Sequence, residues 1–196
     1  MAPSKEEEEE EEKHMTNVVE ERVCTVTSKN VEIENGHWRS EMRANKMWHR
    51  ATYVIIMKND KVWVQRRSKN KDYCPGTLDP TPGGVVAYAE SYEENMQREM
   101  EEEMGLSASD CKVKSICTFP YQDERVKCWG RLYEFIIPPN GPFIYDIKIQ
   151  EEEVDEVMEL TLEEIRKWYI EKPSEWMPDG IHAIKLYLEH TKGVPL

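Results

Sequence analysis

The stretch from Gly84 to Leu106 constrains the fold of this chain more than any other part of its sequence. Ser91 and Glu94 have the spacing of a capping box, in which each residue satisfies a backbone N–H of the other. Gly105 suits the position that follows a helix end, because glycine readily adopts a left-handed conformation there. The pattern therefore predicts a helix over residues 92–104 with both ends marked.

The carboxylates of this helix are not equivalent. Glu99, Glu102 and Glu103 occupy positions i, i+3 and i+4 and so share one narrow arc. Like charges at this spacing repel by about 0.2–0.5 kcal/mol per pair, and a bound cation would reverse that sign. Oxygen ligands without His or Cys favour hard ions such as Mg²⁺ or Mn²⁺. From these residues alone, a solvated acidic helix face remains the alternative.

The residues before the helix bear on that choice. Gly83 and Gly84 allow the backbone to approach a ligand closely and to expose a carbonyl group. From Gly84, five residues lead to Glu90, and seven more lead to Arg98 and the acidic segment that follows it. This spacing resembles the Nudix box, G-x5-E-x7-R-E-U-x-E-E-x-G-U with U a large apolar residue, at every fixed position.

The resemblance implies an α/β class fold, the Nudix fold, with a central mixed β-sheet in an α/β/α sandwich. It also implies hydrolysis of a diphosphate (pyrophosphate) bond in a nucleoside diphosphate-X or a related small molecule, with Mg²⁺ or Mn²⁺ as cofactor. The implied metal-binding residues are Glu99, Glu102, Glu103, Glu90 and the carbonyl of Gly83. Arg98 is expected to pair with Glu90 and orient the ligands. Glu102 and Glu103 are the candidates for the general base, and the sequence does not separate their roles.

A wider resemblance covers roughly Glu21 to the C-terminus. The segments that carry it are His49-Arg50-Ala51, Gln65 to Ser68, Lys71, Pro75-Gly76, Asp79, Trp129-Gly130 and Pro178-Asp179-Gly180. They resemble the YfcD-type Nudix hydrolases, in the branch that includes isopentenyl-diphosphate isomerase. We therefore weighed isomerisation against hydrolysis.

The isomerase resemblance lacks two chemical groups. The isomerase needs a catalytic cysteine shortly after its Pro-Gly segment, and Gly83 stands at that place here. It also uses a carboxylate soon after a Trp-Gly pair, whereas Trp129-Gly130 is followed by Arg131-Leu132-Tyr133. Hydrolysis is favoured; the alternatives are isopentenyl-diphosphate isomerisation and a non-catalytic nucleotide-binding module.

Several further residues are candidates for substrate binding. Arg66 and Arg67 end a predicted strand and Lys71 follows in a basic loop, where guanidinium and ammonium groups could hold a diphosphate. Strand alternation puts the two arginines on opposite faces, so at most one points inward. Arg131 and Glu153 are the other candidates. The resemblance also implies that a glutamate of this region, Glu153 or Glu156, binds metal or serves as base, as one does in several Nudix enzymes.

The hydrophobic pattern predicts strands and helices in an order typical of a mixed sheet between helices. The expected strands are residues 21–28, the first half of an edge hairpin, and 52–57, 62–66, 113–119, 131–137 and 154–160. The expected helices are 40–48, 92–104, 161–170 and 180–190, and residues 69–82 are expected to form a loop.

Charge limits the partners. The chain carries 39 Asp and Glu against 26 Lys and Arg, a net charge of −13, which argues against nucleic-acid binding.

The glutamate run near the N-terminus predicts a disordered acidic tail over residues 1–15, before a single Nudix domain over 16–196. No signal peptide or membrane segment is expected, and the odd number of five cysteines favours a reduced, cytoplasmic protein. A small-molecule diphosphate is the expected partner, and a homodimer stays open.

Overall fold

The computed structural model describes residues 20–144 and 146–193. The predicted acidic tail, residues 1–15, lies outside the described residues. The strands are β1 (Arg22–Val23), β2 (His37–Trp38), β3 (Trp48–Lys58), β4 (Lys61–Arg67), β5 (Leu78–Asp79), β6 (Lys112–Gln122), β7 (Lys127–Ile136) and β8 (Val154–Thr161). The α-helices are α2 (Arg39–Ala44), α3 (Tyr92–Met104), α4 (Leu162–Glu171) and α5 (Pro178–Lys192).

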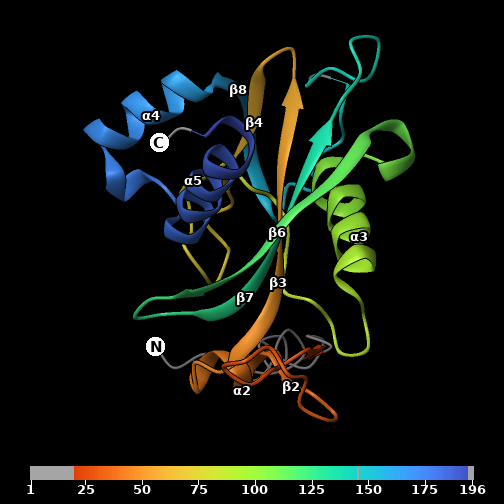
Figure 1. Cartoon of the computed structure of the whole chain (residues 1–196), viewed down its shortest axis with the longest axis vertical. Coiled ribbons are helices and arrows are strands. Elements are labelled where there is room, and N and C mark those ends of the chain that lie inside the picture. The colour runs from red at the N-terminus through yellow and green to blue at the C-terminus, as the bar shows by residue number, and fades with distance from the viewer. Residues whose placement is uncertain (1–19, 145, 194–196) are drawn as a thin grey trace, which may run out of the picture.

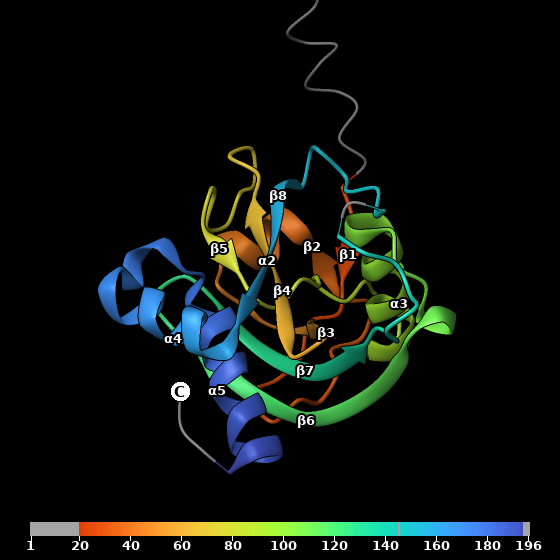
Figure 2. The same ribbon diagram turned by 90° about the horizontal axis from the view of Figure 1, so that it is seen from above.

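The main sheet is mixed, as predicted. Its strand order is β5-β4-β3-β7-β6, and β8 pairs with β4. β3 runs parallel to β7, whereas the other paired strands are antiparallel. The helices cover both faces of this sheet: α3 lies on one side and α4 and α5 lie on the other (Figure 1). The view from above shows the same layers, so the α/β/α sandwich is confirmed (Figure 2).

Alternation along β3 explains why both faces are covered. Tyr53 and Ile55 are buried in the core that includes α4 and α5, whereas Val54 and Ile56 are buried in the core that includes α3. A strand that buries apolar side chains on both faces needs a layer on each.

The sheet splits beside β3, and this split positions the functional site. β4 pairs with β3 only next to their connecting turn, where Met57 is opposite Val62 and Lys58 is opposite Lys61. Farther along β3, the carbonyls of Pro82 and Gly84 accept hydrogen bonds from the backbone N–H groups of Val54 and Thr52, at 3.0 and 2.9 Å. The glycine pair therefore lies against the middle of β3, next to the helix that carries the acidic residues.

Three expectations were wrong in detail. Residues 69–82 do not form a loop throughout, because the buried pair Leu78–Asp79 forms β5 against β4. Residues 21–28 do not form one half-buried strand, because all four residues from Val23 to Val26 are buried. Their backbone partners also change along the segment: Val23 pairs with β2, Cys24 donates to Val86, and Val26 donates to Trp48. The helix expected over 40–48 is α2 and ends earlier, since Lys46 takes a left-handed φ of 48° and the chain then enters β3.

The helix ends follow the sequence signals. α3 spans the predicted residues, and both capping boxes, at Ser91 and Thr161, are formed. Gly105 adopts the left-handed conformation, with a φ of 60°. Among the described residues, no helix is both long and apolar enough to cross a lipid bilayer.

Candidate active site

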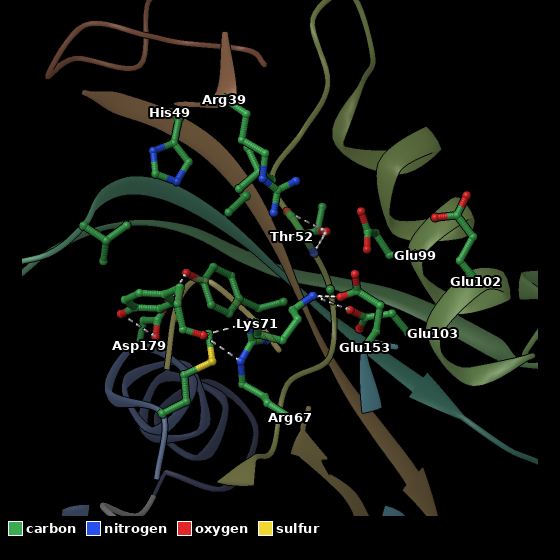
Figure 3. Close-up of a pocket in the computed structure, with 18 of the residues that line it drawn as sticks. Arg39, His49, Thr52, Arg67, Lys71, Glu99, Glu102, Glu103, Glu153 and Asp179 are labelled. Atoms are coloured by element: carbon green, nitrogen blue, oxygen red, sulfur yellow. Dashed lines mark hydrogen bonds and ion pairs between the residues drawn. The ribbon is translucent and has the colours of Figure 1, made fainter. Parts of the chain in front are cut away.

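A cavity of about 250 Å³ opens where the sheet splits. Its walls come from α2, the middle of β3, the start of residues 83–90 before α3 (the segment called the glycine turn below), the acidic face of α3, the loop after β4, the segment before β8 and the start of α5. Figure 3 shows that Glu99, Glu102 and Glu103 lie on one side of it and His49 and Asp179 on the other. The cavity thus brings together segments that are far apart in the sequence.

The three α3 carboxylates line this cavity at different depths. Glu103 is only 3% exposed, whereas Glu102 is exposed. Burial raises the pKa of Glu103 to about 7, and the nearby charge of Glu99 adds to the shift. Burial also raises the pKa of Glu99, against the effect of Arg98. Two crowded carboxylates with raised pKa values are a feature of functional sites.

The glycine pair fits closely around these carboxylates. A Cβ atom on Gly84 would lie 2.3 Å from Oε1 of Glu99, so only glycine leaves room for that carboxylate against the backbone. Gly83 has a φ of 148°, and a Cβ there would lie 2.3 Å from the carbonyl oxygen of Thr52. Within the described part of the chain the Gly83 carbonyl accepts no hydrogen bond, although its neighbours Pro82 and Gly84 do. An unpaired carbonyl therefore lines the same cavity as the acids.

Arg98 connects the acids of the glycine turn and the helix. Its Nε and Nη2 donate to the two oxygens of Glu90 at 3.0 and 3.3 Å. Its Nη1 donates to Glu102 at 2.9 Å, and its Nη2 lies 3.0 Å from Glu99. Asn95 and the backbone N–H of Ala87 also donate to Glu90. Both oxygens of Glu90 therefore accept hydrogen bonds from protein groups. Glu90 lies outside the cavity lining.

Lys71 lies between two carboxylates from different segments. Its Nζ is 3.7 Å from Glu103, and it also forms an ion pair with Glu153 (Figure 3). Burial lowers the pKa of Lys71, and Glu103 opposes that shift. The structure therefore brings together Lys71 and Glu153, which the sequence offered separately as candidates.

The candidate arginines differ in position. Arg67 is buried and lines the cavity, whereas Arg66 points away and pairs with Glu156 at 3.7 Å. Only one of the two faces inward, as alternation predicts. Arg131 contacts Glu93 at 3.3 Å and lies over the ring of Tyr92, outside the cavity lining.

The donor set suits a hard divalent ion in chemistry, because it consists of carboxylates and one unpaired carbonyl. In this conformation one oxygen of each carboxylate faces a cation: Glu99 Oε1 and Glu102 Oε2 contact Arg98, and Glu103 Oε1 lies 3.7 Å from Lys71. No group of three or more His, Cys, Asp or Glu in the described ranges is arranged to hold a metal ion as it stands. The second oxygens of Glu99 and Glu102 would hold an ion while Arg98 keeps its contacts.

No cysteine lines the cavity among the residues that the structure describes. Cys74, which precedes the Pro-Gly pair, is buried, and burial raises the pKa of its thiol. The position that an isomerase cysteine would take is Gly83, whose backbone faces the acids. The geometry therefore does not favour isomerisation.

Many cavity residues were not site candidates from the sequence. Among them are Arg39, Arg43, His49, Thr52 and Asp179. Burial lowers the pKa of His49 to about 4, so the imidazole is neutral near pH 7. Arg39 and Arg43 lie one turn apart on α2, which is a signal for a shared face, but nothing in the sequence shows that α2 lies beside β3.

Comparisons with known proteins all lead to one family. The profile described as the NUDIX domain matches residues 47–180. An uncharacterized Nudix hydrolase, YfcD, of Salmonella typhi is 38% identical over 164 residues, which cover 83% of each chain. YfcD of Escherichia coli K12 is also 38% identical, over 77% of this chain and 78% of its own.

A solved structure, DR0079 from Deinococcus radiodurans, superposes with a TM-score of 0.69 at 21% identity, over 85% of this chain and 99% of that one. A MutT Nudix hydrolase from Burkholderia pseudomallei gives 0.55 at 16% identity, over 74% and 98%. At these identities the likeness concerns the fold.

Proposed function

Because the chain belongs to the Nudix hydrolase family, whose members act on pyrophosphate bonds, we propose that it is a divalent-metal-dependent enzyme for a nucleoside diphosphate-X or a related small molecule. Nudix hydrolases generally use divalent metals, and we propose Mg²⁺ or Mn²⁺ here. The observation that carries the proposal is the single cavity lined by the Gly83 backbone and by Glu99, Glu102 and Glu103.

Residue roles follow from position. We assign Glu99, Glu102, Glu103 and the carbonyl of Gly83 to metal binding, since all four residues line the cavity. When bound, the ion would neutralise charge on the diphosphate and acidify the attacking water. Glu90 is assigned to positioning, because its oxygens already hold Arg98, Asn95 and Ala87.

The chain's own groups would carry out the remaining steps. Arg98 fixes the carboxylates of Glu99 and Glu102 relative to each other and to the glycine turn. Glu102 or Glu103 would accept the proton of the water as it attacks phosphorus in line with the departing oxygen. Among the candidate cations, Arg67 and Lys71 line the cavity and would contact the diphosphate, with Glu153 beside Lys71.

Net charge gives the metal a second role. A chain with a formal charge of −13 repels an anionic substrate at long range. Divalent ions at the carboxylate wall would reverse the local sign and let a diphosphate approach. We also place the enzyme in the cytoplasm, because its five cysteines are free, as is usual in reducing compartments.

The test is a substrate screen with purified protein and Mg²⁺ or Mn²⁺. The panel contains nucleotide sugars, ADP-ribose, dinucleoside polyphosphates, coenzyme A, oxidised nucleotides and prenyl diphosphates. Cleavage of a diphosphate between two organic groups yields two phosphate monoesters, which are detected as inorganic phosphate after an added phosphatase and are then identified. We expect hydrolysis of at least one diphosphate compound and loss of that activity in Glu102→Gln. Conversion of isopentenyl diphosphate to dimethylallyl diphosphate would establish the isomerase instead. Tight nucleotide binding without any product would establish a non-catalytic module.

A further inference from the structure

A buried carboxylate forms part of the cavity on the side away from the acidic helix. Asp179 lies in the first turn of α5 and is 3% exposed, yet it lines the cavity. Figure 3 shows it across the cavity from Glu99 and Glu102. Its Oδ2 accepts a hydrogen bond from the hydroxyl of Tyr53 at 2.8 Å, and its Oδ1 accepts one from Tyr73 at 3.3 Å.

Asp179 differs from the other acids of this region because it has no cationic partner. Glu99 and Glu102 pair with Arg98, and Glu103 pairs with Lys71. Across residues 20–144 and 146–193, no Lys, Arg or His nitrogen lies within 4.0 Å of the Asp179 carboxylate, since no ion pair includes it. A buried carboxylate without a cation is costly, and the positive end of the α5 dipole offsets only part of that cost.

The carboxylate also has acceptor capacity left. An ionised carboxylate has about four lone-pair sites, and the two tyrosine hydroxyls occupy two of them. Neither hydroxyl can supply a second proton, because each has already donated its own to Asp179. A hydrogen-bond donor on a molecule that enters the cavity would use this remaining capacity.

The rest of the cavity wall suits an organic moiety next to that donor. Ala51, Val85, Val126 and Met177 contribute apolar surface to the same cavity. A ligand whose diphosphate lies at Lys71 and the α3 acids would extend its other end across the cavity toward Asp179. That end is one of the two organic groups that the diphosphate joins, the nucleoside or X.

We propose that Asp179 binds an amino or hydroxyl group of one of the two organic groups joined by the diphosphate, the nucleoside or X, and so determines which diphosphates this enzyme accepts. This inference rests on the proposed function, in which the diphosphate lies at the opposite wall. A substrate that presents a keto oxygen or an anionic group to Asp179 would bring it against a carboxylate with no hydrogen-bond proton between them. Sites built around a buried polar group reject analogues that cannot pair with it.

A purely structural role is the competing explanation. In that case Asp179 serves only to join α5 to β3 and to the loop after β4, through Tyr53 and Tyr73. Asn at position 179 keeps the shape and an acceptor oxygen, and adds an N–H₂ donor. Substrate preference therefore separates the two explanations better than stability does.

The experiment compares matched ligand pairs with wild-type enzyme and Asp179→Asn. Cytidine against uridine diphosphate sugars, and adenosine against inosine ones, exchange an amino group for a keto group. Uridine diphosphate glucose against its deoxyglucose analogues removes hydroxyl groups. We expect the donor-bearing member of at least one pair to be preferred at least tenfold in kcat/KM by the wild type, and Asp179→Asn to lose or reverse that preference. The pair that responds distinguishes a base amino group from a sugar hydroxyl.

Two controls keep the result interpretable. Asp155→Asn changes an exposed acid outside the cavity and is expected to keep the wild-type preference. Calorimetric binding of the same pairs to chelator-treated protein measures selectivity without turnover, so failed hydrolysis with intact, Asp179-dependent selectivity would count against the proposed function alone. Equal treatment of every pair by the wild type, or a preference unchanged in Asp179→Asn, would overturn the inference. The wild-type comparison stands even if the variant does not fold.

Discussion

Arg98 holds Glu90 by two hydrogen bonds, from Nε at 3.0 Å and from Nη2 at 3.3 Å. The remaining Nη1 reaches Glu102, and Nη2 also lies 3.0 Å from Glu99. One guanidinium thus fixes the glycine turn to two carboxylates on α3. A lysine has no planar fork and could not make these contacts together.

We expect Arg98→Lys to lower kcat/KM by about 10- to 100-fold, the range typical of residues that orient metal ligands. Circular dichroism and the thermal midpoint should change little, because Arg98 is half-buried and the helix caps are untouched. Arg166→Lys, an exposed position on α4, is the matched control. Activity equal to wild type in Arg98→Lys would show that the clamp is dispensable.

Glu102→Gln and Glu103→Gln should each reduce kcat by at least about 100-fold, if these carboxylates bind metal or accept the proton. Gln keeps the size of the side chain, so the buried Glu103 site should not collapse. Glu101→Gln on the exposed side of the same helix serves as the control and should keep full activity. Undiminished turnover in both cavity variants would disprove the assigned mechanism.

Alanine substitutions at the two glycines should have different effects, on activity at Gly84 and on stability at Gly83. In Gly84→Ala the new Cβ meets the end of the Glu99 side chain, which can swing away, so we expect a native fold with activity reduced more than about tenfold. In Gly83→Ala the Cβ meets the backbone oxygen of Thr52 at a left-handed φ, so we expect a loss of stability of about 2–4 kcal/mol. Urea denaturation and kinetics on both proteins check this contrast, and similar behaviour of the two would contradict it.

Divalent metal should stabilise the protein as well as activate it. Mg²⁺ at about 100 times its Kd would add roughly 2.7 kcal/mol, which corresponds to a rise of about 5–10 °C in the thermal midpoint. Glu99→Gln should lose most of this rise, whereas Glu101→Gln should keep it. A chelator should abolish turnover, and added Mg²⁺ or Mn²⁺ should restore it. A midpoint that does not respond to either ion in the wild type would argue against a metal site at these carboxylates.

The regular elements were predictable because their signals are local. The apolar face of α3 and its capping box depend only on neighbouring residues, and so do the apolar run of β3 and the alternating pattern of β4. β5 was not predicted, because a strand of two residues, Leu78 and Asp79, is too short to show a hydrophobic period. The pairing of β5 with β4 depends on residues that are distant in the sequence, and so does the burial of residues 23–26.

The site was predictable on one side only. The spacing in one helix places Glu99, Glu102 and Glu103 on one arc, and the pairing of Arg98 with Glu90 follows from the family pattern. The opposite wall comes from α2, β3 and α5, which meet only after the sheet has formed. Asp179 is an ordinary helix-start residue in the sequence, and its burial against two tyrosines depends on packing that no local pattern encodes.

Asp179 should make the stability of the folded protein depend on pH. Burial raises its pKa from 3.8 to about 6, and the nearby charge of Asp79 adds to the shift. Between these values the folded state binds more protons than the unfolded state, so the free energy of unfolding falls as pH rises through this interval. The contribution is on the order of 3 kcal/mol at most, since one pKa unit corresponds to about 1.4 kcal/mol. Below pH 4 the penalty is absent, and above pH 6 it is complete.

Urea denaturation at pH 4, 5, 6 and 7 measures this dependence. Asp179→Asn cannot ionise, so the wild type should lose more stability than the variant between pH 4 and pH 7, by about 1–3 kcal/mol. Glu103 contributes a slope of the same sign between pH 4.5 and about pH 7 in both proteins, because burial raises its pKa from 4.5 to about 7, and subtracting one curve from the other removes it. Asp155→Asn should give a curve parallel to the wild type. If the free energy of unfolding of Asp179→Asn also ran parallel to that of the wild type across these pH values, the Asp179 carboxylate would not have the raised pKa that its burial implies.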